Sequence, residues 1–230
     1  MRKLLLLLIL INFACTPVYI PNSRSIPMFE NAGEVSIDGY INGSGFDLNT
    51  GVAVSDHVAI IANGAYARKD DSDSEDFQSH KYGELGIGYF SDTGTNLRTE
   101  VFGGYGLGEA TSVDNYVFFT TNSERTTGYY NRMFLQGNMG WSPGNFQMGG
   151  AFRFSHVTFT EFETTSSSFT NSRSATFAEP AFFLKGGDDI KFNLQAGFNW
   201  PMHDDIAFDY RFLHLTFGIG AKIGGKKKKD

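Results

Sequence analysis

Apolar and polar residues alternate with a period of two through most of the chain after residue 30. In the stretch 190–200 the even positions read Ile, Phe, Leu, Ala, Phe and Trp, and the odd positions read Lys, Asn, Gln, Gly and Asn. The stretches 97–107, 133–141 and 146–154 repeat this pattern, and weaker versions occur at 33–41, 47–54, 58–67, 80–90, 175–185 and 206–223. A period of two is typical of β-strands, and helical periodicity is absent. The pattern predicts an all-β protein of about ten strands.

The connections between the predicted strands are alternately short and long. Tight turns rich in Gly, Asp and Asn are predicted at 55–57, 92–96, 143–145 and 186–189. Longer loops rich in Ser, Thr, Asn and Asp are predicted at 68–79, 111–128 and 161–174, and the brief connections near 42–46 and 201–205 fall in the same set. Outer-membrane barrels have short periplasmic turns and long outer loops. We therefore predict one antiparallel up-and-down β-barrel, with eight strands if 33–41 and 47–54 pack elsewhere.

The alternation alone does not say which face of the strands points inward. In a membrane barrel the polar face lines the lumen, whereas in a soluble barrel the apolar face does. The polar face carries charges of both signs at mid-strand, which would pair across a narrow lumen: Glu84, Arg98, Glu100, Arg132, Arg153 and Glu179. Trp141 and Trp200 lie at strand ends, where aromatic girdles meet the membrane surface. These features favour a transmembrane barrel over a soluble barrel or sandwich.

Composition agrees with strands and excludes one class of partner. The chain has 23 Phe and 27 Gly among 230 residues, a bias that suits pleated sheets rather than helices. The formal net charge is −6, so no basic field points to nucleic acid.

The first residues have the pattern of a secretory signal peptide. Met1-Arg2-Lys3 is basic, 4–11 is apolar without a break, and Ala14 precedes Cys15. The apolar run is shorter than the roughly 20 residues that a spanning helix needs. Cys15 is the only cysteine and stands where bacterial lipoproteins are acylated, although Asn12 and Phe13 depart from the usual lipobox. The alternative is an ordinary signal peptide with an incidental cysteine.

The domain organisation follows from these boundaries. We expect a signal peptide at 1–14, a lipidated tether at 15–30, the barrel at 31–224 and a basic tail at 225–230. The tether contains Pro17, Pro21 and Pro27, so it should be extended and non-helical. Because the first and last strands both end on the short-turn side, we expect the N-terminus in the periplasm.

The chain resembles small outer-membrane barrel proteins, such as the membrane domain of outer membrane protein A. More narrowly, it is similar to uncharacterised barrel lipoproteins of the Bacteroidetes lineage. The resemblance rests on the lipobox ending in Cys15, on Pro27-Met28-Phe29 followed by Gly33-Glu34, and on the run Ser55-Asp56-His57-Val58-Ala59-Ile60-Ile61-Ala62-Asn63. It implies a fold and an outer-membrane location, and it brings no established activity.

Histidines near the long loops are the candidates for catalysis. His156 is followed at two residues by Thr158 and further on by Glu161, and His203 precedes Asp204 and Asp205. Such groups could activate a nucleophile or a water molecule. However, Thr is a poor nucleophile, no Ser stands at that spacing, and Asp-rich turns are common. His57 and His214 have no evident partner in the sequence.

Two charged segments have ordinary explanations. The acidic residues of 70–76 could bind a divalent cation, but they lack the mid-loop Gly and ligand spacing of a calcium loop. Lys226–Lys229 could contact anionic lipid, or form a solvated end. We expect no metal, cofactor or catalysis.

The leading hypothesis is an outer-membrane lipoprotein with a structural or accessory role. Its partners would be outer-membrane lipid and either lipopolysaccharide or another envelope protein. The alternatives are a lipid-anchored soluble barrel that binds a small apolar ligand, and a surface hydrolase.

Overall fold

A computed structural model describes residues 18–225, apart from 44, 71–76, 94, 114–124, 165–167, 204–205 and 207. Eleven strands lie within these residues: β1 (Val35–Asn42), β2 (Gly45–Ala53), β3 (Val58–Asp70), β4 (Phe77–Asp92), β5 (Leu97–Ser112), β6 (Thr126–Trp141), β7 (Phe146–Thr164), β8 (Ser168–Gly186), β9 (Ile190–Phe198), β10 (Trp200–Pro201) and β11 (Leu213–Ile223). Within this part of the chain no helix is long and apolar enough to cross a membrane.

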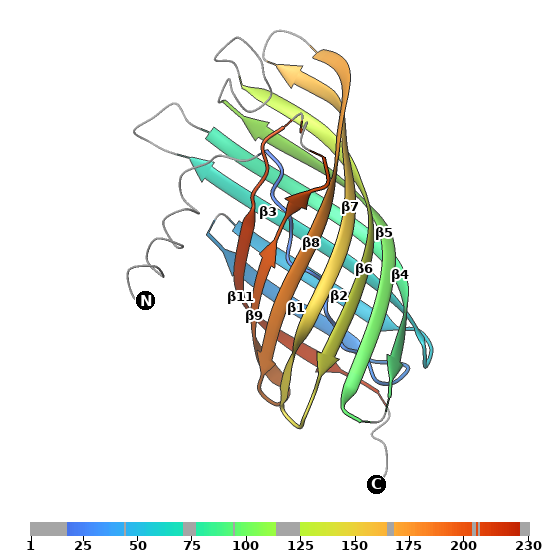
Figure 1. Ribbon diagram of the computed structural model, residues 1–230. Coiled ribbons are helices and arrows are strands. Elements are labelled where there is room, and N and C mark those ends of the chain that lie inside the picture. Colours follow the sequence, from blue (N-terminus) through green and yellow to red (C-terminus); the bar gives the residue numbers. More distant parts are fainter. Residues whose placement is uncertain are drawn as a thin grey trace.

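Sequential antiparallel pairing from β1 to β9, followed by β11, closes the sheet into a barrel (Figure 1). Closure is made by β1 and β11, whose register runs from Val35 opposite Ile223 to Ile41 opposite Phe217. Among the described residues, ten strands form the wall and the short β10 adds to β8 beyond it. The prediction of an antiparallel up-and-down barrel of about ten strands is confirmed.

The tight turns predicted at 55–57, 92–96, 143–145 and 186–189 all lie at one end of the barrel, here called the short-turn end. The other end, here called the long-loop end, holds the connections β1–β2, β3–β4, β5–β6, β7–β8 and β9–β11. At this end the predicted loop 161–174 is wrong for the most part, because β7 continues to Thr164 and β8 begins at Ser168. Phe162 and Phe169 are the only large apolar residues in the described parts of this extension, so the sequence there has no sustained alternation of hydrophobicity. The predicted strand 206–223 is wrong in its first part, since β11 begins only at Leu213.

A bulge interrupts β7 near the long-loop end. Tyr130 pairs with Phe159 and Tyr129 pairs with Glu161, so Thr160 is the extra residue. An extra residue shifts the alternation of faces, which explains why Phe159 and Phe162 are both buried although three positions separate them.

Residues 18–29 lie inside the barrel, and all of them are buried (Figure 1). We call residues 18–30 the lumen segment. The sequence predicts an extended tether here, but not that this part of it fills the barrel. The proposed lipidation site, Cys15, lies outside the described residues, as do the signal peptide and the lysine-rich tail.

Candidate functional site

The interior of the barrel holds the six charged residues that the alternation places on the polar face. All six are at most 8% exposed: Glu84, Arg98, Glu100, Arg132, Arg153 and Glu179. Three of them meet, because Nη2 of Arg132 lies 2.5 Å and Nη2 of Arg153 lies 3.6 Å from carboxylate oxygens of Glu84. Neighbouring charges of opposite sign thus offset part of the cost of burying each ion.

The other three charged residues bind the lumen segment instead of one another. Glu179 lies 3.5 Å from Nη2 of Arg24, and Arg98 lies 2.7 Å from the carboxylate of Glu30. Glu100 accepts a hydrogen bond from the backbone N–H of Phe29 at 2.9 Å. The first three charged residues also reach this segment, since Asn22 donates to Glu84 and accepts from Arg132 and Arg153. All six charges that the sequence assigns to the lumen therefore hold the segment in place.

Side chains of the wall also satisfy the backbone of the lumen segment. Pro21 and Pro27 cannot donate to a strand ladder, and buried backbone groups without a partner are costly. Asp47 accepts from the N–H of Ser23 at 2.7 Å, and Gln195 accepts from the N–H of Arg24 at 3.0 Å. The backbone carbonyls of residues 23–25 accept hydrogen bonds from side-chain amides of the wall, which belong to Asn49, Gln136, Asn138 and Gln195.

The lumen segment departs from the extended conformation at Met28. Its φ of 52° lies in the left-handed region, which is uncommon for a residue with a side chain. The Met28 carbonyl accepts hydrogen bonds from Arg98 at 3.5 Å and from Lys222 at 2.5 Å. Inward Gly140 leaves room for the Met28 side chain, since a Cβ there would lie 2.9 Å from the Met28 sulfur. The wall is therefore shaped to the segment as well as bonded to it.

Three apolar clusters fill the space that the polar network leaves. The first lies toward the long-loop end and contains Val18, Tyr19, Tyr130, Phe159 and Phe177. The second, which contains Phe29, Phe90 and Phe102, lies toward the short-turn end. The third includes Ile26, Met28 and Phe183. Each cluster receives residues of the lumen segment, so the segment is part of the protein core.

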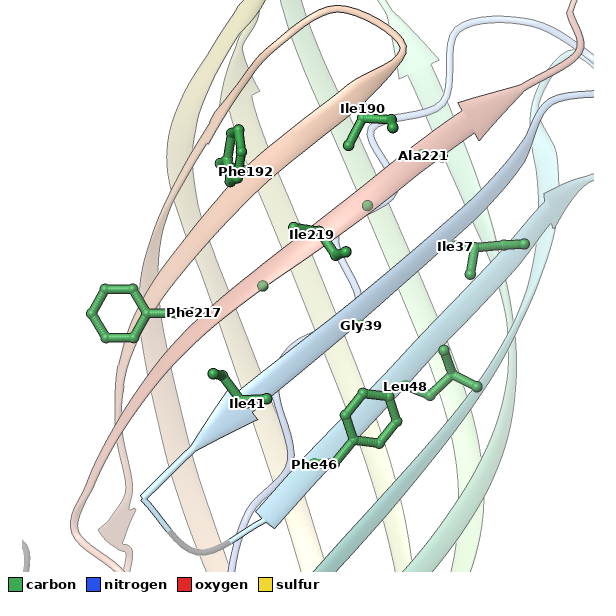
Figure 2. Close-up of a pocket in the computed structure, with 12 residues that line it drawn as sticks. Ile37, Gly39, Ile41, Phe46, Leu48, Ile190, Phe192, Phe217, Ile219 and Ala221 are labelled. Carbon is green, nitrogen blue, oxygen red and sulfur yellow. The ribbon is translucent and has the colours of Figure 1, made fainter.

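The outer wall has the opposite character, because large apolar side chains point away from the barrel. Leu85, Phe182 and Phe192 are 66%, 67% and 74% exposed. Where β1, β2, β9 and β11 adjoin, such side chains line a shallow apolar groove of about 810 Å³ on the outer surface. Figure 2 shows its lining residues, which include Ile37, Phe46, Phe192 and Phe217.

The two tryptophans stand on this outer surface at opposite ends of the barrel. Trp141 ends β6 at the short-turn end and is 49% exposed. Trp200 begins β10 at the long-loop end, is 51% exposed and stacks on Phe198 with ring centroids 6.0 Å apart.

The candidate catalytic histidines do not form a triad within the described residues. His156 is exposed, and its Nδ1 lies 2.9 Å from the hydroxyl of Thr176 on β8, not from that of Thr158. The cross-strand neighbour is closer because the two residues pair directly in the ladder. His203 is exposed, while Asp204 and Asp205 lie outside the described residues.

The remaining histidines have structural partners. His57, in the β2–β3 turn, stacks on Tyr89 of β4. Buried His214 lies 3.8 Å from Asp47. The sequence also gives no sign of the role of buried His80, whose Nε2 lies 2.6 Å from the hydroxyl of Tyr130. Within the described residues, no group of three or more His, Cys, Asp or Glu side chains is arranged to hold a metal ion. Most of the acidic stretch 70–76 lies outside them.

The barrel thus combines an apolar outer wall with a polar interior that its own N-terminal segment fills. No protein-family model and no curated protein sequence matches this chain.

Proposed function

We propose that the protein is an outer-membrane β-barrel lipoprotein with a closed lumen and a structural or accessory, non-catalytic role at the cell surface. The observation that carries this proposal is the inversion of polarity across the wall. Apolar side chains such as Leu85 and Phe192 face outward, while Glu84 and Arg153 are buried inside. A soluble barrel would gain nothing from exposing so much apolar surface, whereas lipid would cover it.

The height of the apolar surface fits a membrane. On β7 the outward apolar residues run from Phe146 to Phe154. At ~3.4 Å per residue and a tilt near 40°, this stretch covers roughly 20 Å of height, close to the ~25 Å band of outer-membrane barrels. Toward the long-loop end the outer face becomes charged, and Lys81 pairs there with Glu109.

The row of paired residues that contains this ion pair lies beyond the apolar band, toward the long-loop end. Glu109 stands opposite Tyr129 in the ladder, and Tyr129 stands opposite Glu161. In three neighbouring strand pairs, charged and tyrosine side chains thus replace aliphatic ones along one row of the sheet. The polar extension of β6, β7 and β8 beyond this level would project from the cell surface, where it could contact lipopolysaccharide or another envelope protein.

The two alternatives receive less support from the geometry. A ligand-binding soluble barrel needs an apolar cavity inside, but the lumen segment and its polar partners occupy that space. A surface hydrolase needs a base beside a strong nucleophile, whereas His156 lies beside the hydroxyl of Thr176, a poor nucleophile, and is exposed on the outer wall.

An arginine scan of the outer wall tests the membrane proposal. Leu135 is 56% exposed and lies within the apolar band of β6. We expect Leu135→Arg to reduce the free energy of unfolding by about 2–4 kcal/mol, because the charge would enter hydrocarbon. The measurement is urea unfolding of the chain folded into lipid vesicles, followed by heat-modifiable migration on gels.

Tyr129→Arg is the matched control. Tyr129 lies on the same face of the same strand, beside Glu109, Glu161 and Glu163. An arginine there would remain in water near carboxylates, so we expect little loss of stability. Equal, small effects of both substitutions, with the protein recovered in soluble fractions, would contradict a membrane location.

A further inference from the structure

The two ends of the lumen segment lie at opposite ends of the barrel. The Tyr19 N–H donates to the Asp209 carbonyl at 3.0 Å, and the Arg211 N–H donates to the Tyr19 carbonyl at 3.0 Å. Asp209 and Arg211 belong to the connection before β11, at the long-loop end. Glu30, in contrast, pairs with Arg98 and Lys222, which lie close to the short-turn ends of β5 and β11.

The length of the segment agrees with a full crossing. Twelve residue steps separate Val18 from Glu30, and an extended chain covers at most about 3.6 Å per step, or roughly 43 Å. That reach exceeds the ~30 Å thickness of the hydrocarbon core, so the segment can cross it without being fully extended. The chain then turns at the short-turn end and begins β1 at Val35.

The direction of the crossing is fixed by specific bonds. Backbone donors of the segment meet carboxylates of the wall at fixed positions, as in the bonds from the N–H of Ser23 to Asp47 and from the N–H of Phe29 to Glu100. Its charges are also matched in order, with Arg24 beside Glu179 and Glu30 beside Arg98. A segment running the other way would place Glu30 away from Arg98 and Lys222, at the opposite end of the barrel.

We propose that the chain preceding Val18 emerges on the outer side of the membrane, so that the mature N-terminus is displayed at the cell surface. This inference rests on the proposed membrane function, with the short turns in the periplasm. It reverses the periplasmic N-terminus expected from the sequence, because the chain crosses the lumen once before its first strand. Three steps separate Cys15 from Val18, a reach of at most about 11 Å. An acyl group on Cys15 would therefore enter the outer leaflet.

Accessibility in intact cells tests this topology. One epitope tag is inserted after Pro17, a second between Val113 and Arg125 in the β5–β6 connection, and a third after Gly225. Cys15 stays unchanged, and heat-modifiable migration verifies that each variant folds. We expect an antibody to bind the first and second tags on intact cells. The third should be bound only after the outer membrane is permeabilised.

The possible failures differ from one another. If the second tag is exposed and the first requires permeabilisation, the inference is overturned while the membrane proposal stands. If the protein is recovered in soluble fractions and all three tags are bound without permeabilisation, both the membrane proposal and the inference about the N-terminus are overturned.

Single cysteines keep the test available if a tag prevents folding. Thr16→Cys reports on the N-terminus, exposed Met202→Cys on the long-loop end, and exposed Asn145→Cys on the short-turn end. The unaltered chain, which has only Cys15, serves as the blank for a membrane-impermeant maleimide. We expect the first two variants, and not the third, to gain label over the blank on intact cells. Label on Asn145→Cys and none on Thr16→Cys would overturn the proposal.

Discussion

Glu84 is the residue on which the interior network converges. Its two oxygens accept hydrogen bonds from four side chains, those of Asn22, Asn63, Tyr82 and Arg132. Arg153 adds a second guanidinium at 3.6 Å. The carboxylate thus links β3, β4, β6 and β7 to the lumen segment. A neutral group in its place would not compensate the positive charges of Arg132 and Arg153.

Neutralising this carboxylate should destabilise the barrel strongly. Glu84→Gln leaves Arg132 and Arg153 buried beside a neutral amide, and removing one partner of a buried pair costs about 3–5 kcal/mol. We expect a loss of this size in urea unfolding of the protein folded in vesicles. The double variant Glu84→Gln with Arg132→Met should recover part of it, since one unpaired charge is gone.

The matched control is an ion pair on the outer surface. Lys81→Ala breaks the exposed pair with Glu109, which water screens, so the free energy of unfolding should barely change. If Glu84→Gln and Lys81→Ala had similar effects, the interior network would not be what holds the barrel together.

At the scale of elements, the lumen segment behaves as part of the fold without belonging to a sheet. Val18 and Tyr19 at one end, and Ile26, Met28 and Phe29 at the other, belong to the apolar clusters. The polar centre, Asn22–Ser25, meets the polar network. Because side chains of several strands hold its backbone, we treat it as fixed in the native state.

Hydrogen exchange measures whether the segment stays in place. The amides of Ser23 and Phe29 are bonded to buried carboxylates, so we expect them to exchange as slowly as strand amides. Asp47→Ala removes the acceptor of Ser23 and should speed exchange at that amide, leaving β6 amides such as that of Leu135 unchanged. Exchange within minutes at both amides of the unaltered chain would mean that the segment leaves the lumen readily.

The strands were predictable from the sequence and the lumen segment was not, for a physical reason. Alternation is a local property, so 190–198 and 97–107 show their strand character without knowledge of the rest of the chain. The lumen segment has no period, and its partners are distant: Asp47 is 24 positions from Ser23, and Gln195 is 171 positions from Arg24. Only the closed barrel brings these groups together.

Alternation places the six charges on the polar face for the same reason, but their partners in the lumen segment could not be predicted. Alternation assigns Glu100 and Glu179 to the polar face. Their partners, the Phe29 amide and Arg24, lie in a proline-containing stretch that reads as a linker. The strand extension around 161–174 escaped prediction for a different reason, because its apolar residues, Phe162 and Phe169, are too few to form a detectable alternation.

At the scale of the whole molecule, barrel size explains why a segment fits inside. Eight strands leave an interior just wide enough for side chains, and the diameter grows with strand number. Ten strands leave added width, which here accommodates one extended chain and the side chains that bind it. The clusters around Tyr19 and Phe29 occupy the lumen toward its two ends.

A barrel filled in this way should not conduct ions. Arg132, Arg153 and Glu179 lie in the lumen at 1% exposure or less, so no water-filled path runs past them. We expect planar lipid bilayers containing the full chain to show no stepwise current, under conditions in which an inserted porin conducts. Heat-modifiable migration of the protein recovered from the same vesicles shows that it was folded. Steady single-channel steps from the unaltered chain would mean that the lumen segment leaves the barrel in the membrane, and rapid exchange at the Ser23 amide should then accompany them.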